Sequence, residues 1–247
     1  MIRPLALLLA CALAAPGAAQ PTRPAPDQLS CLVEPSRRVL VSSAVPGIAR
    51  RVAFERGDMV QAGAPLLELH NDVERAQLAL ALERAEFARR RMGRNREVIQ
   101  RNLLSPQEMD EMRTDIRLAE LEANRARAEV ERRTTASPIS GLVLERRISA
   151  GEFVNTEPFA ELIALDPLHV ELVLRAEAFG LVREGMQATL HLAAPVNATR
   201  SARVAIVDRA IDSGSGTFRV RLLLPNADLA LPSGVACRLV ALAPPAE

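Results

Sequence analysis

One short pattern occurs twice in this chain, and a long segment of helical periodicity separates the two copies. Each copy has a turn that ends in glycine, a second glycine ten residues later and a proline that opens an aliphatic strand: Val45-Pro46-Gly47, Gly57 and Pro65 in the first, and Pro138-Ile139-Ser140-Gly141, Gly151 and Pro158 in the second. Short apolar runs between such turns are typical of β-strands. Because neither copy can close alone, we expect residues 31–71 and 134–165 to form one split β-sandwich.

Residues 72–133, between the copies, show the seam of a coiled coil, in which apolar residues recur every three or four positions. In the first stretch the seam residues are Leu78, Ala81, Ala85, Ala88, Met92 and Ile99, with Asn95 as a polar break; in the second they are Met109, Met112, Ile116, Ala119, Ala123, Ala126 and Val130. Two helices of about 30 residues, each roughly 45 Å long, must fold back on each other when a tight turn joins them. The segment therefore predicts an antiparallel α-helical hairpin.

The expected ends of these helices follow from capping residues. Asp72 is the expected N-cap of the first helix. The first helix is interrupted at Leu103–Pro106, where Ser105 can cap the second helix, Pro106 takes its first position and Glu108 completes a capping box. These residues predict the turn at the far end of the hairpin.

Charges agree with the pairing of the two helices. Residues 89–101 carry six arginines against one acid, whereas residues 106–116 carry four acids against one arginine. We expect ion pairs across the hairpin on a solvated surface, each contributing little to stability. The arginine run is weak evidence for nucleic-acid binding, since no aromatic residues interleave with it.

The remaining sequence predicts a small β-barrel over residues 166–243. Residues 166–174 alternate apolar and polar side chains, a short helix or turn is expected at Ala176–Arg183, and further strands are expected at residues 187–192, 203–208, 217–224 and 235–240. Alternating antiparallel strands with one short helix are typical of such barrels. Residues 20–30 precede the first copy and are rich in proline, so we expect a linker there.

The first 19 residues have the features of a secretory signal peptide. Arg3 precedes an apolar run from Leu5 to Ala15, which is too short to cross a bilayer, and small residues around Ala19 suit a signal peptidase. We expect cleavage near Ala19 and a periplasmic product. A lipoprotein attached through Cys11 is the alternative.

Cys31 and Cys237 are the two cysteines that remain after signal removal. In an oxidising compartment an isolated pair favours a disulfide over catalysis. Two buried free thiols are the alternative.

Composition argues against an enzyme. There is no lysine, since all 31 basic residues are arginine, and this excludes attachment of lipoate or biotin and chemistry through a lysine. The three histidines, His70, His169 and His191, have no acidic or cysteine residues at metal-ligand spacing. The net charge of +1 favours neither nucleic acid nor an anionic membrane. We therefore expect no catalytic residues, no cofactor and no metal.

The chain resembles the periplasmic adaptor, or membrane fusion protein, family. The resemblance covers residues 31 to about 243 and is carried by Val45-Pro46-Gly47, Arg56-Gly57-Asp58 with Val60 and Gly63, Ser137-Pro138-Ile139-Ser140-Gly141, and Gly151-Glu152 with Val154, in order around the hairpin. It implies a mainly β, α+β fold: a split lipoyl-like domain (a barrel-sandwich hybrid), interrupted by the hairpin and followed by the β-barrel. The chain ends at Glu247, so a membrane-proximal domain after the barrel is not expected.

The resemblance also implies partners and contact residues. In this family the hairpin tip docks on a trimeric outer-membrane exit duct through an arginine, a leucine four residues on and a serine seven further; Arg94, Val98 and Ser105 have that spacing, with valine replacing leucine. The implied function is a non-catalytic adaptor, forming a homo-oligomeric ring between an inner-membrane efflux transporter and the duct. A periplasmic ligand-binding protein is the alternative, and the transported substrate is not encoded in these motifs.

Overall fold

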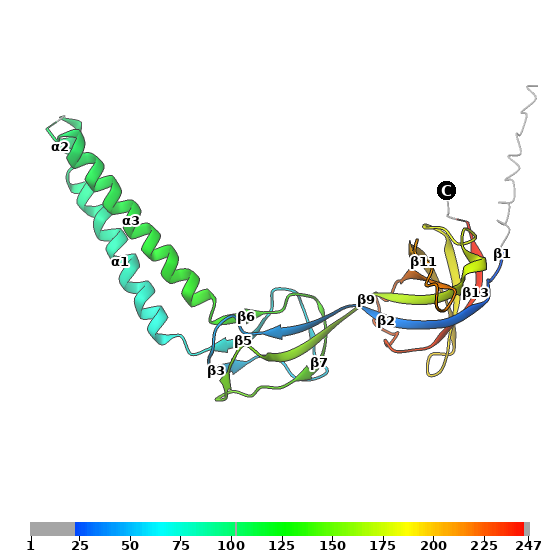
Figure 1. Cartoon of the computed structure of the whole chain (residues 1–247). Helices are drawn as coiled ribbons and strands as arrows, with labels where there is room; N and C mark the ends of the chain where they lie inside the picture. Colours follow the sequence, from blue (N-terminus) through cyan, green and yellow to red (C-terminus); the bar gives the residue numbers. More distant parts are fainter. Residues whose placement is uncertain (1–22, 102, 245–247) are drawn as a thin grey trace, which may run out of the picture. The chain divides into compact units, whose positions relative to one another are not determined.

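The computed structural model describes residues 23–101 and 103–244, so the predicted signal peptide and Cys11 lie outside the described residues (Figure 1). The chain divides into two compact units. Among the described residues, one comprises 23–34, His169–Leu224 and 234–244, and the other comprises 35–101, 103–168 and Pro225–Ser233. Two strands, β2 (Gln28–Ser42) and β9 (Pro158–Arg175), have residues in both units.

The second unit contains the lipoyl-like domain and the hairpin. Its elements, besides parts of β2 and β9, are β3 (Gly47–Val52), β4 (Met59–Val60), β5 (Pro65–Leu69), α1 (Asp72–Arg94), α2 (Arg96–Gln100), α3 (Pro106–Glu131), β6 (Thr134–Ala136), β7 (Gly141–Arg146) and β8 (Phe153–Val154).

The two copies of the repeat are interleaved. Within each copy the long strands pair antiparallel, β3 with β5 and β7 with β9. The short strand of each copy pairs with the first strand of the other: β8 pairs with β3, and β4 pairs with β7. Each copy thus supplies a strand that the other needs, which confirms the predicted split domain.

The hydrogen bonds repeat as well. Gly57 N donates to Val143 O at 2.9 Å, and Gly151 N donates to Ala49 O at 2.8 Å. Both glycines have positive φ, 95° and 90°, a conformation in which glycine avoids the steric strain of other residues. The turn glycines identified in the sequence are therefore required by the backbone.

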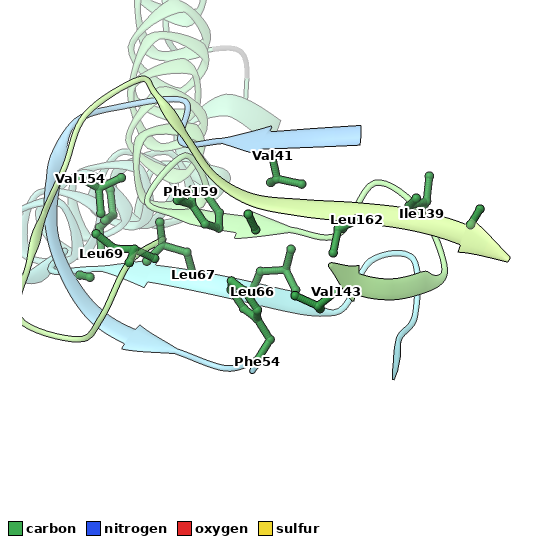
Figure 2. Packing of buried hydrophobic residues seen from close by; sticks show 14 residues of the cluster. Val41, Phe54, Leu66, Leu67, Leu69, Ile139, Val143, Val154, Phe159 and Leu162 are labelled. Carbon is green, nitrogen blue, oxygen red and sulfur yellow. The ribbon is translucent and has the colours of Figure 1, made fainter. Parts of the chain in front are cut away.

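Both copies contribute to one hydrophobic core. Buried side chains from β5, β7 and β9, including Leu66, Leu67, Val143 and Phe159, pack together with Phe54 (Figure 2). The Phe54 and Phe159 ring centroids are 6.2 Å apart. The core is aliphatic apart from these rings, as the composition implies.

The hairpin follows the predicted seams. Ala81 and Ala85 of α1 are buried, as are Met112, Ala123 and Ala126 of α3, and the other predicted seam residues are at least half-buried. Alanine at these positions lets the two helices approach closely. The first helix ends earlier than expected, because Asn95 separates α1 from α2 and its Nδ2 donates to Arg91 O at 3.0 Å.

The first unit is the β-barrel. Its elements are β1 (Arg23–Pro24), β10 (Gln187–Leu192), β11 (Ala198–Val207), β12 (Thr217–Leu224) and β13 (Cys237–Ala243), with the ends of β2 and β9. The strand order runs β1-β13-β10-β11-β12-β9. Val33 closes the barrel: its N–H donates to Val235 O at 2.9 Å, and its carbonyl accepts from Gly234 N at 2.7 Å.

Two expectations need correction, and a third is met. The predicted linker 20–30 contains β1, which pairs with β13, and the start of β2, where Gln28 hydrogen-bonds the main chain at Cys237 and Leu239. The short helix or turn expected at Ala176–Arg183 is present as a 3-10 helix at Ala176–Ala178 followed by turn residues. The N-cap of α1 is Asn71 rather than Asp72.

The compact units also divide the chain differently from the expected domain ranges. Pro225–Ser233 belongs to the second unit although it connects barrel strands β12 and β13. The buried amide of Asn226 explains this, since its Nδ2 donates to Leu165 O and Leu231 O, each at 3.0 Å.

Candidate functional site

The three residues predicted to contact a partner lie at the far end of the hairpin (Figure 1). Arg94 is the last residue of α1, Val98 lies in α2, and Ser105 is the N-cap of α3. Arg94 and Ser105 are exposed, and Val98 is half-buried. The α2 segment is therefore the tip, with one of these residues before it, one within it and one after it.

Ser105 has a local structural role. Its Oγ accepts from Glu108 N at 3.3 Å and donates to Glu108 Oε2 at 2.8 Å, and its own N–H donates to the same carboxylate at 2.8 Å. The hydrogen bonds from the backbone and then the hydroxyl of Ser105 lower the pKa of Glu108. The predicted capping box is present, so the hydroxyl is already engaged within its own helix.

Arg94 is placed differently from Arg89 and Arg91 of the same helix. Arg89 pairs with Glu120 at 2.5 Å, and Arg91 pairs with Asp115 at 3.3 Å, both across the helices as the charge pattern predicted. Within residues 23–101 and 103–244, no ion pair involves Arg94. Its guanidinium instead lies 5.8 Å from the centroid of the Phe87 ring, an arrangement that favours a cation.

The tip also exposes an apolar side chain that the sequence analysis did not select. Leu103 is 69% exposed, and Phe87 beneath Arg94 is 57% exposed. Leu103 lies in the interruption between the helices, where no seam position requires an apolar residue. An apolar residue outside the helical seam, such as Leu103, is the sequence feature that could have indicated this exposed contact.

The predicted disulfide cysteines meet at the seam of the barrel. Cys31 of β2 and Cys237 of β13 are joined by a disulfide in the structure, with Cα atoms 4.9 Å apart. The bridge lies next to the isolated pairing of Leu32 with Ala236. It thus connects the two strands whose hydrogen bonds close the barrel.

The histidines do not converge. His70 Nδ1 lies 3.7 Å from Asp72 Oδ2, on an exposed surface. His169 is in β9, where burial and then the Arg221 charge lower its pKa. Over the described part of the chain, no cluster of three or more His, Cys, Asp or Glu side chains is arranged to hold a metal ion.

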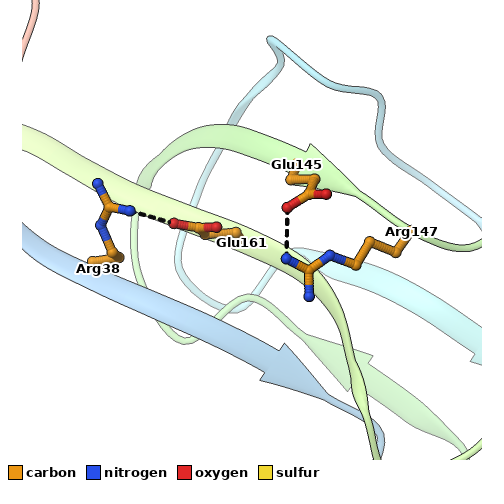
Figure 3. A network of polar contacts seen from close by, with 4 residues as sticks. All are labelled: Arg38, Glu145, Arg147 and Glu161. Atoms are coloured by element: carbon orange, nitrogen blue, oxygen red, sulfur yellow. Dashed lines mark hydrogen bonds and ion pairs between the residues drawn. The ribbon is translucent and has the colours of Figure 1, made fainter.

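Two ion pairs lie on the lipoyl-like domain, one between two strands and one at the end of β7. Arg38 of β2 pairs with Glu161 of β9 at 2.8 Å, and Arg147 pairs with Glu145 at 2.6 Å (Figure 3). The hydrogen bond from Arg147 lowers the pKa of Glu145. Arg147 also lines a pocket together with Phe153 and Phe159.

None of the helices in the described residues is both long enough and apolar enough to span a membrane.

Two family models match the chain. Residues 56–135 match the α-helical hairpin domain of RND membrane fusion proteins, and residues 170–244 match a CusB-like β-barrel domain. The first match covers the hairpin with both its junctions, and the second covers the barrel strands after the start of β9.

Curated proteins are similar to this chain over most of its length. An uncharacterized protein of Haemophilus influenzae is 28% identical over 214 residues, covering 84% of this chain and 55% of the relative. The multidrug resistance protein MdtE of Escherichia coli K12 is 26% identical over 211 residues, covering 74% of this chain and 55% of MdtE. The chain spans about half the length of the curated relatives it matches.

A solved structure shares the fold. A MacA-MexA chimeric protein containing the α-hairpin domain of Pseudomonas aeruginosa MexA superimposes with a TM-score of 0.72 at 17% identity, over 90% of this chain and 82% of the chimera.

Proposed function

We propose that this chain, which belongs to the membrane fusion protein family, is the periplasmic adaptor of a tripartite efflux system. In this proposal the tip formed by the end of α1, α2 and the start of α3 docks on an outer-membrane exit duct. The lipoyl-like domain and the barrel form a homo-oligomeric ring that contacts an inner-membrane transporter. The function is mechanical and non-catalytic.

The observation that carries the proposal is the state of Arg94. The arginines at positions 89 and 91 are neutralised by acids of α3, whereas Arg94 at the tip retains its charge for a partner. The planar guanidinium suits carboxylates and carbonyl oxygens at the ends of another protein's helices. The exposed Leu103, between α2 and α3, adds an apolar side chain at the tip.

Charge reversal at the tip tests this proposal. Arg94→Asp should leave folding and export intact, because an exposed substitution usually changes stability by about 0.5 kcal/mol or less. It should abolish efflux and cross-linking to the duct. The measurements are drug or metal tolerance of cells and in vivo cross-linking from a cysteine placed at the exposed Gln107.

The control must change the same charge away from the tip. Arg89 is unsuitable, because its loss would also leave Glu120 unpaired across the helices. Arg117 is exposed on α3, about 18 Å along the helix from Ser105. Arg117→Asp should transport normally. Normal transport by Arg94→Asp as well would refute docking through Arg94.

Val98 and Ser105 are proposed to contribute less. Val98 is half-buried and supports α2, and Ser105→Ala would remove a helix cap worth about 1 kcal/mol whether or not a partner is present. A loss of transport in Ser105→Ala therefore supports docking only if Ser105→Asp, which preserves a cap, also fails to transport.

We also propose export with signal cleavage near Ala19 and formation of the Cys31–Cys237 disulfide in the exported protein. The cross-link closes a loop of about 200 residues, for which chain entropy gives roughly 5 kcal/mol before strain. Intact-mass analysis and non-reducing peptide mapping of the exported protein test both statements. A lipid on Cys11, or two free thiols, would contradict them.

A further inference from the structure

A cavity on the lipoyl-like domain, beside the short strand β8, has no part in the function proposed above. Its volume is about 430 Å³, which falls within the range of about 300–1,000 Å³ that is usual for sites of small organic molecules. The lining of this β8 cavity includes Arg147, Phe153 and Glu157 at the rim, and Ile148, Val154 and Phe159 on the floor.

The floor of the β8 cavity is apolar and firmly packed. Ile148, Val154 and Phe159 are 9%, 3% and 3% exposed, and all three belong to the core of the domain. Arg147 N donates to Phe159 O at 2.8 Å, so the main chain holds two sides of the cavity together. A ligand in the cavity would therefore rest on a preformed apolar surface.

Phe153 at the rim is an aromatic residue that the core does not use. It is 68% exposed, and its register partner in β3, Ile48, is 49% exposed. The chain has only six phenylalanines and no tyrosine or tryptophan, so aromatic side chains are scarce in it. The exposed face of such a ring attracts cations.

The charges at the rim leave one carboxylate for a ligand. Arg147 is neutralised by Glu145, to which its guanidinium donates at 2.6 Å (Figure 3). Glu157 is exposed, and no ion pair with another described residue involves it. Its N–H donates to Asn155 Oδ1 at 2.8 Å, which fixes the turn that carries the carboxylate. The rim thus combines an aromatic ring with a net negative charge.

We propose that the β8 cavity binds an apolar organic cation. The ring of Phe153 and the carboxylate of Glu157 stabilise the positive charge, while the floor contacts the apolar groups of the ligand. Aromatic faces are the usual partners of quaternary ammonium groups in proteins. An anion of the same shape would be repelled by both rim groups. The proposal is independent of docking at the hairpin tip, since the tip contributes nothing to this cavity.

Titration of the full exported chain with tetraphenylphosphonium, a permanent apolar cation, tests the proposal. Calorimetry should show saturable binding at a single site. Tetraphenylborate has the same shape and the opposite charge, and it should bind at least about tenfold more weakly, because the ring and the carboxylate both favour a cation. Equal affinity for the two ions, or no saturable binding of the cation, would overturn the proposal.

Substitutions at the rim test the two groups separately. Phe153→Leu keeps an apolar side chain and should weaken binding of the cation about fivefold, through loss of the cation–π contact. Glu157→Gln keeps the side-chain length and should weaken it about threefold at low salt. Glu184→Gln removes an exposed carboxylate of the barrel and should bind like the parent protein. An affinity that Phe153→Leu or Glu157→Gln leaves unchanged would also contradict the assignment.

A fluorescent reporter locates the bound cation. Because the chain has no tryptophan or tyrosine, Phe153→Trp introduces a single indole, which binds cations at least as well as a phenyl ring. Its emission should change over the same range of cation concentration as the calorimetric signal. Phe179→Trp places the reporter at a 46% exposed position of the barrel and should not respond. Equal responses from the two variants would mean non-specific quenching and no site at β8.

Discussion

The two copies of the repeat have the same strand pairing and different surroundings. The first glycine of each copy pairs with a valine of the other: Gly47 with Val154, and Gly141 with Val60. A Cβ atom at Gly141 would lie 2.1 Å from the carbonyl oxygen of Ile163 in β9, whereas at Gly47 the nearest atom is the end of the Arg133 side chain. The repeat gives the two copies the same backbone pairing. The atoms that pack against the first glycine differ, because Gly47 faces the Arg133 side chain and Gly141 faces the main chain of β9.

A second comparison concerns the core. Leu66 and Phe159 follow the strand-opening prolines of their copies and are 1% and 3% exposed within the same cluster. Because the short strands are exchanged, neither copy has a core of its own. The copies differ in sequence and surroundings and should nevertheless behave as one cooperative unit.

The largest expected effect would test this cooperativity. Phe159→Ala should destabilise the lipoyl-like domain by about 4 kcal/mol and Leu66→Ala by about 3 kcal/mol, since each leaves a cavity in the shared core. Both variants should lower the same calorimetric transition. A separate transition for one copy in either variant would show that the copies fold independently.

Replacing the first glycine of each copy by alanine should destabilise the two copies to different extents. Gly141→Ala should destabilise by about 3 kcal/mol, because the new methyl group meets a main-chain oxygen that can move only with β9. Gly47→Ala should lower the free energy of unfolding by only about 1 kcal/mol, since the flexible Arg133 side chain can shift. Chemical denaturation of the two variants measures the difference, and equal losses would contradict the assigned surroundings.

The smallest expected loss of stability comes from removing either of two equivalent hydroxyl groups, one in each copy. Ser43 Oγ donates to Val45 O and Ser137 Oγ donates to Ile139 O, both at 2.6 Å, and both serines are buried. Alanine at either position should destabilise by about 1 kcal/mol, the typical net contribution of such a hydrogen bond. Losses that differ by more than about 1 kcal/mol would mean that the copies are not equivalent at these turns.

Local patterns predicted much of this fold. The seams of α1 and α3, the capping box at Ser105 and the turn glycines each depend on residues a few positions apart. The split of the domain followed from the spacing of two glycines in each copy. These features are visible in sequence because the interactions that fix them are local or repeated.

Features that depend on distant partners were missed. The segment with prolines at positions 24 and 26 is predicted as a linker, yet its β1 pairs with β13 and Gln28 at the start of β2 hydrogen-bonds Leu239, at the other end of the chain. Asp72 was a reasonable cap by residue type. The first turn of α1 begins one residue earlier, and its Glu74 is taken by Arg133, a contact between residues 59 positions apart in the chain.

The tip was predicted only in part. The spacing of Arg94, Val98 and Ser105 placed these residues at the tip of the hairpin, where the structure also has them. Contact between the tip and a partner protein stays a prediction. The sequence did not indicate that Arg94 has no ion pair with another described residue, because every arginine between positions 89 and 101 has a similar sequence environment. For Arg89 and Arg91, the register of α1 against α3 decides which acid each meets.

Glu68 of β5 pairs with Thr134 of β6, so the chain leaves for the hairpin and returns from it on adjacent strands. Neighbouring strands lie about 4.8 Å apart. To the rest of the domain, the whole hairpin is therefore equivalent to a tight turn, and its length is an independent variable. Adding one heptad to each arm would extend the reach by about 10 Å while keeping the seam in register. The number of heptads thus sets the distance between the tip and the lipoyl-like domain, while the strands at the base of the hairpin stay unchanged.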